Sequence, residues 1–485
     1  MFGRLILLIT ALGTTVLAGT AGPSAKAIPA DDAAITHLVN RLTYGPRPGD
    51  IERIRAMGVE KWIDQQLSPE RIDNQALDAR LARLETLALD SHTIMQDYAE
   101  PAMAERRERK QAAGAADADA SVMTTGPVSE AIRKDREVLT DLEEAKLLRA
   151  LYGERQLEEV LVDFWFNHFN VFAGKGQTRN YVNDYEREAI RPYVLGKFRD
   201  MLGATAKHPA MLFYLDNWQS SVAGPTGAAG ATGAAGVRRV TGINENYARE
   251  LLELHTLGVD GGYTQQDVVN VARAFTGWTM RPREASGFIF APGRHDRGEK
   301  IVLGQTIRAG GGIDDGERVL DIVAAHPSTA RHIAKELAIR FVSDDPPAAL
   351  IDRSAAVFTS TKGDLRAVVR SIITSPEFYA ADARRAKVKT PFEFVVSALR
   401  ATGADVRTAL PLARTLRDMG MPLYFCQPPT GYDDTAATWV SAGALVSRMN
   451  FAVDLAKNQV RGVRVPLSEE QTMALKIGAP EFQRQ

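Results

Sequence analysis

Apolar residues recur at three- and four-residue spacing along most of the 485-residue chain. Between residues 31 and 67 this spacing predicts three short helices separated by turns that contain glycine. Further apolar stripes within residues 330–341 and 368–373 predict helices in the second half. The run from Thr390 to Glu393 combines an N-cap residue, a proline at the first helical position and an acidic third residue, which is typical of a helix start. The pattern therefore predicts a mainly α-helical protein.

The pattern changes after Trp278, where two short apolar runs predict β-strands. They are residues 287–290 (GFIF) and 300–303 (KIVL), and we interpret them as one hairpin closed by the segment APGRHDRGE. The predicted fold class is a large single multi-helix assembly with one small β-hairpin. Segments near residues 99–127 and 220–240 lack an apolar stripe, so we predict flexible insertions in a single helical domain of residues 28–485.

The stretch from Thr241 to Met280 carries the densest signals in the chain and predicts two helices joined by a tight loop. Gly258 stands where a helix commonly ends in a left-handed residue. Thr264 and Asp267 have the spacing of a capping box, which marks the start of the second helix.

Two carboxylates lie on the same flank of the first of these helices. At about 100° per residue Glu250 and Glu253 fall together, whereas His255 projects from the other flank. Like charges at this spacing repel unless a cation or a shared proton compensates. The pair is therefore a solvated acidic face, or one side of a structural ion pair with an arginine from another segment, or part of a functional site.

A histidine lies on the buried face of the helix predicted for residues 154–168. Leu157, Phe164 and Trp165 recur at helical spacing with His168, so the imidazole points to the same side as the aromatic rings. Histidines on such a face are more often hydrogen-bonded core residues than ligands. The polar neighbour Asn167, in an otherwise aromatic setting, favours a functional role as the alternative.

His295 and Asp296 are adjacent in the segment that joins the two predicted strands. Such a pair can ligate a metal ion or act as a base with its orienting partner, although both residue types are also common in polar turns. We predict that His168, Glu250, Glu253, His295 and Asp296 converge on one partly buried catalytic site, because mutual pairing or a shared divalent ion would offset their desolvation. A divalent metal there would be Zn, Mn or Fe rather than Ca. Without metal, a glutamate with a raised pKa would be the general acid.

Several segments carry a resemblance to a known family. The runs FWFNHFNVF (164–172), NENYARELLELHTLG (244–258), HDRGEKIVLG (295–304) and KVKTPFEFVVSALR (387–400) resemble, in the same order, blocks of the bacterial family called domain of unknown function 1800 (DUF 1800). The likeness covers nearly the whole chain after residue 27. It implies an exported, mostly helical protein without an established activity. At one position the chain departs from the family pattern, because Tyr432 follows C-Q-P-P-T-G where a tryptophan is expected.

Residues 1–27 have a basic start, a short apolar stretch and a final A-K-A, which predict a cleavable signal peptide. No later apolar stretch reaches the roughly 18 residues of a membrane span. We therefore expect an exported protein, periplasmic or extracellular, without a membrane span. The formal net charge is −1 and basic residues are dispersed, so nucleic acid is not an expected partner. The single cysteine, Cys426, excludes an intramolecular disulfide.

The sequence lacks the common motifs of hydrolases and nucleotide-binding proteins. There is no G-x-S-x-G elbow, H-E-x-x-H motif, phosphate loop or dinucleotide fingerprint. Two hypotheses of function follow. The favoured one is a metal- or acid/base-dependent hydrolase-like enzyme that acts on an envelope or extracellular polymer. The alternative is a non-catalytic exported binding or assembly factor that works with another secreted protein.

Overall fold

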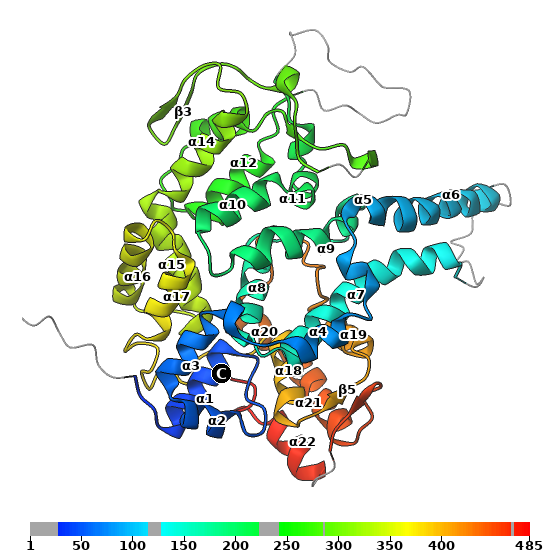
Figure 1. The fold of residues 1–485 in the computed structure, drawn as a ribbon, viewed down its shortest axis with the longest axis vertical. Helices are drawn as coiled ribbons and strands as arrows, with labels where there is room; N and C mark the ends of the chain where they lie inside the picture. The colour runs from blue at the N-terminus through cyan, green and yellow to red at the C-terminus, as the bar shows by residue number, and fades with distance from the viewer. Residues whose placement is uncertain (1–27, 115–127, 223–241, 285–286, 467–469) are drawn as a thin grey trace, which may run out of the picture.

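The computed structural model describes residues 28–114, 128–222, 242–284, 287–466 and 470–485. Helices make up most of it (Figure 1), which confirms the predicted mainly α fold class. The three short helices expected after Asp31 are present. The α-helices of the first part of the chain are α1 (Asp32–Leu42), α2 (Asp50–Met57), α3 (Val59–Gln66), α4 (Gln75–Leu81), α5 (Ser91–Thr93), α6 (Glu100–Gly114), α7 (Glu130–Tyr152) and α8 (Gln156–His168).

The remaining α-helices form the middle and the C-terminal part of the molecule. The middle helices are α9 (Val182–Asp184), α10 (Phe198–Lys207), α11 (Pro209–Tyr214), α12 (Asn246–Glu250), α13 (Gln265–Ala274), α14 (Ile313–Ala324), α15 (Pro327–Phe341), α16 (Ala348–Ser360) and α17 (Leu365–Ile373). The C-terminal helices are α18 (Pro391–Ala401), α19 (Leu410–Asp418), α20 (Ala436–Trp439), α21 (Ala442–Ala456) and α22 (Glu470–Gly478). The described chain also contains π-helical turns, which are η3 (Ile94–Ala99), η5 (Tyr185–Ile190) and η8 (Leu251–Thr256).

The β-structure differs from the predicted single hairpin. Three two-stranded antiparallel sheets occur in the described residues, and they pair β1 (Trp278–Thr279) with β2 (Ile289–Phe290), β3 (Lys300–Val302) with β4 (Gln305–Ile307), and β5 (Asp405–Val406) with β6 (Val463–Arg464). The two predicted strands exist, but their pairing with each other is wrong. Leu303 and Gly304 both adopt a positive φ, 49° and 75°, so the chain reverses in two residues and β3 pairs with β4.

One continuous hydrophobic core extends from Ala34 in α1 to Ile477 in α22. Helix α8 lies near the centre of the molecule (Figure 1), and its predicted stripe is confirmed because Leu157 and Trp165 are fully buried. The same face of α8 ends at His168, which is only half-buried. The core therefore brings the last turn of α8 to the wall of a cavity.

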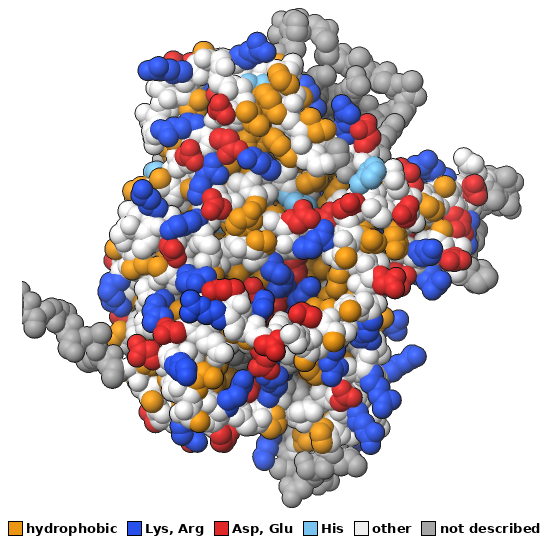
Figure 2. Space-filling view, in the orientation of Figure 1, with side chains coloured by type: hydrophobic (Ala, Val, Ile, Leu, Met, Phe, Trp, Pro, Cys, Tyr) orange, Lys and Arg blue, Asp and Glu red, His pale blue; other side chains and the backbone are white. Residues whose placement is uncertain are grey.

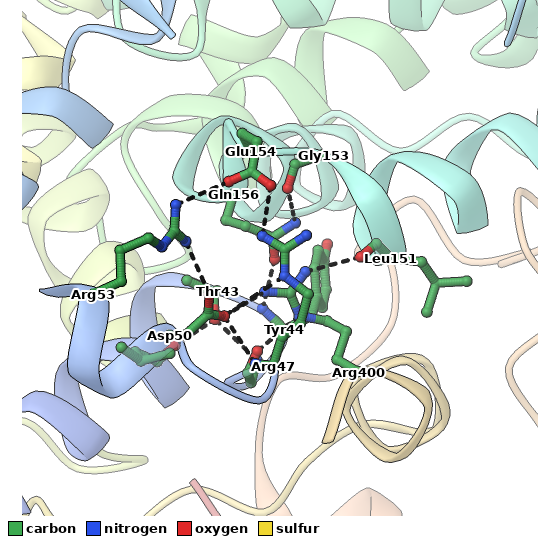
Figure 3. Close-up of polar contacts among 12 residues, drawn as sticks. Thr43, Tyr44, Arg47, Asp50, Arg53, Leu151, Gly153, Glu154, Gln156 and Arg400 are labelled. Carbon is green, nitrogen blue, oxygen red and sulfur yellow. Dashed lines mark hydrogen bonds and ion pairs between the residues drawn. The ribbon is translucent and has the colours of Figure 1, made fainter. Parts of the chain in front are cut away.

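A buried arginine joins the N-terminal loop to the helices that build this cavity (Figure 3). Arg400 at the end of α18 donates from Nε to the carbonyl oxygen of Gly45, 2.7 Å away, and from a terminal nitrogen to that of Leu151, 3.0 Å away. Asp50 of α2 lies 3.6 Å from the same guanidinium. One side chain thus fixes the turn after α1, the end of α7 and the end of α18 relative to one another.

The predicted insertions are described only in part. The first predicted insertion begins as α6, which lies beside α7 and projects with it from the body of the molecule (Figure 1). Residues 115–127 and 223–241, together with the predicted signal peptide at 1–27, lie outside the described residues. None of the described helices combines the length and the apolar character that a bilayer crossing requires.

Candidate functional site

A cavity of about 470 Å³ lies between α8, the π-helical turn η8, α15, the start of α18 and the loop of residues 421–434. We call it the central pocket. Its size falls in the range of small-molecule sites. Apolar rings form part of the wall, and charged or ionisable side chains form the rest, among them Lys146, Asp163, His168, Glu253, His332, Glu336, Arg340, Glu393 and Asp434.

Two histidines of the pocket are held by backbone carbonyl groups. His168 Nε2 donates to the oxygen of His255, and His332 Nε2 donates to the oxygen of Leu254, each over 3.1 Å. Because a carbonyl oxygen only accepts, the Nε2 of each ring carries the proton, and the Nδ1 of the neutral ring keeps its lone pair. The ring centroids of His168 and His332 are 6.1 Å apart. Burial, and then the neighbouring His332 and His255, hold the pKa of His168 well below its ordinary value, so His168 is neutral at pH 7.

The π-helical turn η8 supplies the two carbonyl groups that bind the imidazoles of His168 and His332. The spacing predicts His255 on the flank opposite to Glu250 and Glu253, and in the structure the wider turn holds it in the core with only 2% exposure. Leu257 donates its N–H to the carbonyl of Leu252, five residues back, which is the π-helical pattern. The carbonyls of Leu254 and His255 then accept the imidazole N–H groups.

The two predicted glutamates have different surroundings. Glu253 lines the pocket and accepts a hydrogen bond of 3.3 Å from the hydroxyl group of Tyr263. Glu250 does not belong to the pocket lining. Burial, and then the negative charge of Glu253, raise the pKa of Glu250 above its ordinary value. Another carboxylate, Glu336, lines the pocket one helical turn after His332 on α15.

Positive charges also reach the pocket. Lys146 pairs with Asp163 over 2.6 Å, with both side chains largely buried. Arg340 pairs with Glu393 and lies 3.7 Å from a carboxylate oxygen of Asp434. Burial raises the pKa of Asp434, whereas Arg340 is among the groups that hold the pKa of Glu393 low, at about 2. The pocket therefore contains ion pairs that polarise it and carboxylates that differ in proton affinity.

Asn167 fixes the C-terminal loop against α8. Its amide nitrogen donates to the carbonyl oxygen of Tyr432, and its amide oxygen accepts from the N–H of Tyr432, each over 2.6 Å. Gly431 has a φ of 72°, and a Cβ atom there would lie 2.4 Å from the carbonyl oxygen of Asn167. Only glycine lets the backbone at position 431 come this close to Asn167. The thiol of Cys426 also lines the pocket, but burial raises its pKa to about 11, so it is protonated and unsuited to be a nucleophile.

His295 and Asp296 do not line this pocket. His295 is 4% exposed, and its two ring nitrogens contact the carbonyl oxygen of Thr276, at 2.8 Å, and a carboxylate oxygen of Asp315, at 3.2 Å. Lys300 donates to the same Asp315 oxygen over 2.7 Å. We call His295, Lys300 and Asp315 the closed cluster. Asp296 lies beside it and accepts two hydrogen bonds, of 2.9 and 3.1 Å, from one guanidinium group, that of Arg273.

The five residues predicted to converge are thus divided between different surroundings. His168 and Glu253 meet in the central pocket, Glu250 lies on the same helix outside the lining, and His295 and Asp296 are bound in and beside the closed cluster. The desolvation of the His-Asp segment is offset by partners that the sequence pattern did not reveal. Within the described residues, no three His, Cys, Asp or Glu side chains are grouped so that they could hold a metal ion.

Comparison with known protein families shows to which family the chain belongs. Residues 37–483 match the model described as "Protein of unknown function (DUF1800)". The chain belongs to the DUF1800 family. Searches among curated proteins and among solved structures found no match. Of the DUF1800 blocks recognised in the sequence, three reach the central pocket, through His168, Glu253 and Glu393, and the block of residues 295–304 supplies His295 and Lys300 of the closed cluster.

Helix α15 contributes functional candidates that sequence reasoning missed. His332, Glu336 and Arg340 follow one another at four-residue intervals and all line the pocket. Only the opposite, apolar stripe of this helix was recognised in the sequence. A polar stripe of histidine, glutamate and arginine along a largely buried helix is the signal that would have identified this wall.

Proposed function

We propose that this DUF1800 protein is an exported, hydrolase-like enzyme that performs acid/base chemistry in the central pocket on an envelope or extracellular polymer. The observation that carries the proposal is the paired anchoring of His168 and His332 by backbone carbonyls. Hydrogen bonds that fix ring orientation and tautomer are what a proton-transferring histidine requires. The carboxylates of Glu253 and Glu336 line the same cavity, as an acid/base site needs.

In this proposal His168 moves the proton. Its Nδ1 atom takes a proton from a water molecule, the water oxygen attacks the substrate, and the imidazolium returns the proton to the leaving group. The depressed pKa of His168 keeps the ring in the neutral form that can accept a proton. Lys146 and Arg340 supply positive charge for an anion that develops during attack. Glu253 and Glu336 orient the water and the substrate hydroxyl groups.

The size of the pocket limits the substrate. About 470 Å³ accommodates one sugar-sized or amino-acid-sized unit and not a run of polymer chain. The enzyme would therefore act on a chain end or a side group. Export, for which the sequence of residues 1–27 is the support, would bring the pocket into contact with such polymers.

The test is an activity screen of the purified protein on cell-wall fragments and polysaccharides, with and without a chelator. Once an activity is found, His168→Gln is expected to lower kcat at least about 100-fold, because general acid/base groups contribute 10²–10⁴-fold. Glu253→Gln should lower it as well. Glu299→Gln, at an exposed carboxylate, is the matched control and should be without effect.

Retained activity in both pocket variants would refute the proposed chemistry. If instead no substrate is turned over, while a secreted partner binds the wild-type protein and the Glu253→Gln variant equally, the binding or assembly factor is the better description. Circular dichroism and melting temperature of each variant separate lost chemistry from lost folding.

A further inference from the structure

Helix α21 is unusual for a surface helix because it is apolar on two faces. Phe451, Ala452 and Leu455 face the core. The solvent face carries large aliphatic side chains that are 39% to 57% exposed, and these are Leu445, Val446, Met449 and Val453. A surface helix normally presents polar residues to water. The exposed aliphatic row therefore requires an explanation other than folding.

The apolar surface is concentrated in this part of the molecule. Of the eleven exposed large hydrophobic side chains among the described residues, six fall within residues 440–475. The additional members are Val440, before α21, and Leu475 on α22, which packs against α21. Scattered single side chains would be normal, but a group on two packed helices marks an interaction surface.

A basic hollow continues the apolar row. Met449, Val453 and Lys457 follow one another at four-residue intervals, so the row leads directly to Lys457. Lys457 lines a shallow hollow of about 640 Å³ together with Arg407 and Arg464, and its described lining contains no carboxylate. Within the part of the chain that the structure describes, these three cations form no ion pair. Figure 2 shows Lys and Arg side chains gathered along the lower right edge, where Figure 1 places α19 and β5.

We propose that this face docks on an anionic phospholipid membrane. The aliphatic side chains of α21 would enter the boundary between headgroups and acyl chains, and Arg407, Lys457 and Arg464 would contact lipid phosphates. Charge complementarity favours this occupant over a second copy of the chain, because a symmetric contact would bring the cations of both copies into one interface. Nucleic acid would use the cations but leave the aliphatic row exposed. The proposal concerns peripheral binding and is independent of the chemistry of the central pocket.

Co-sedimentation of the full chain with vesicles tests the proposal. We expect binding to vesicles of equimolar phosphatidylglycerol and phosphatidylcholine, and much weaker binding to phosphatidylcholine alone. The triple variant Arg407→Gln, Lys457→Gln, Arg464→Gln should lower the partition coefficient on the order of 100-fold, since each cation near an anionic surface contributes about fivefold. Val446→Ser with Met449→Ser should lower it roughly tenfold through lost apolar burial.

The matched control replaces three exposed cations elsewhere, Arg297, Arg308 and Lys335, by glutamine, which changes the net charge equally. It should keep most of the binding. The proposal would be overturned if this control lost as much vesicle binding as the first triple variant, or if the wild-type protein did not bind anionic vesicles. A dimer in light scattering that dissociates in the Val446→Ser, Met449→Ser variant would overturn it in favour of a second copy. Binding to DNA oligonucleotides that is lost only in the first triple variant, without vesicle binding, would assign the hollow to nucleic acid instead.

Discussion

The closed cluster and the central pocket are built from the same kinds of residue and have opposite properties. In the closed cluster His295 uses both ring nitrogens, and Asp315 accepts from His295 and Lys300 through one buried oxygen. In the central pocket His168 and His332 use Nε2 alone, and each faces a cavity. Residue type therefore does not distinguish a site closed by its own hydrogen bonds from a site that opens to a cavity. The two sites differ instead in how many hydrogen-bonding atoms of their side chains remain without a partner.

The difference has an energetic meaning. A buried charge that loses its partner leaves an uncompensated charge, so removing one member of a closed cluster is expensive. A half-exposed carboxylate beside a cavity is already solvated in part and has less to lose. The closed cluster should therefore contribute mainly to stability, and the pocket mainly to chemistry.

The largest expected effect follows from breaking the closed cluster. Lys300→Met should lower the free energy of unfolding by about 3–5 kcal/mol, because Asp315, which is 1% exposed, would lose the ammonium group that pairs with it over 2.7 Å. Urea denaturation measures the change. Lys335→Met, at an exposed lysine, is the matched control. A loss below about 1 kcal/mol would contradict the view that this cluster stabilises the fold.

An effect of intermediate size is expected in the pH dependence of the free energy of unfolding. His168 is neutral in the folded protein and regains its ordinary pKa of 6.5 on unfolding, so the unfolded state binds more protons below that pH. Stability should therefore fall as the pH drops below about 6.5, by up to about 1.4 kcal/mol per pH unit for this residue. His168→Gln should remove that part of the slope between pH 7 and pH 5.

The matched control for this experiment is His92→Gln, because His92 is exposed. Unfolding curves at several pH values give the slope for each variant. An unchanged slope in His168→Gln would mean that the imidazole is not held neutral by burial, and the proposed proton acceptor would lose its physical basis.

The sequence predicted the helices well because their signals are local. The capping boxes at Thr264 and Thr390 form as predicted, and Gly258 adopts the left-handed conformation expected of it. Each feature depends on residues within one or two turns, so it can be predicted from a short stretch of sequence.

The site was harder to predict because it depends on distant partners. The pairing of Asp315 with His295 and Lys300 joins a helix to a loop and a strand, and nothing in the periodicity of either segment reveals it. The π-helical turn after Glu250 places the carbonyl groups of Leu254 and His255 where they accept from the two imidazoles, and such a turn has no simple sequence signature. His168 and Glu253 were nevertheless recognised from local patterns, His168 as a polar residue on an apolar stripe and Glu253 as one of two carboxylates on the same helix flank.

The smallest expected effect on the free energy of unfolding is that of replacing Glu336 in the central pocket. Glu336 lines the central pocket and, among the described residues, has no ion-pair partner, so Glu336→Gln removes a charge without leaving another unpaired. The free energy of unfolding should change by no more than about 0.5 kcal/mol in either direction. Urea denaturation beside Lys300→Met under the same conditions provides the measurement. If Glu336→Gln costs several kcal/mol, then the pocket is as tightly compensated as the closed cluster, and open hydrogen-bonding positions would no longer separate the two regions.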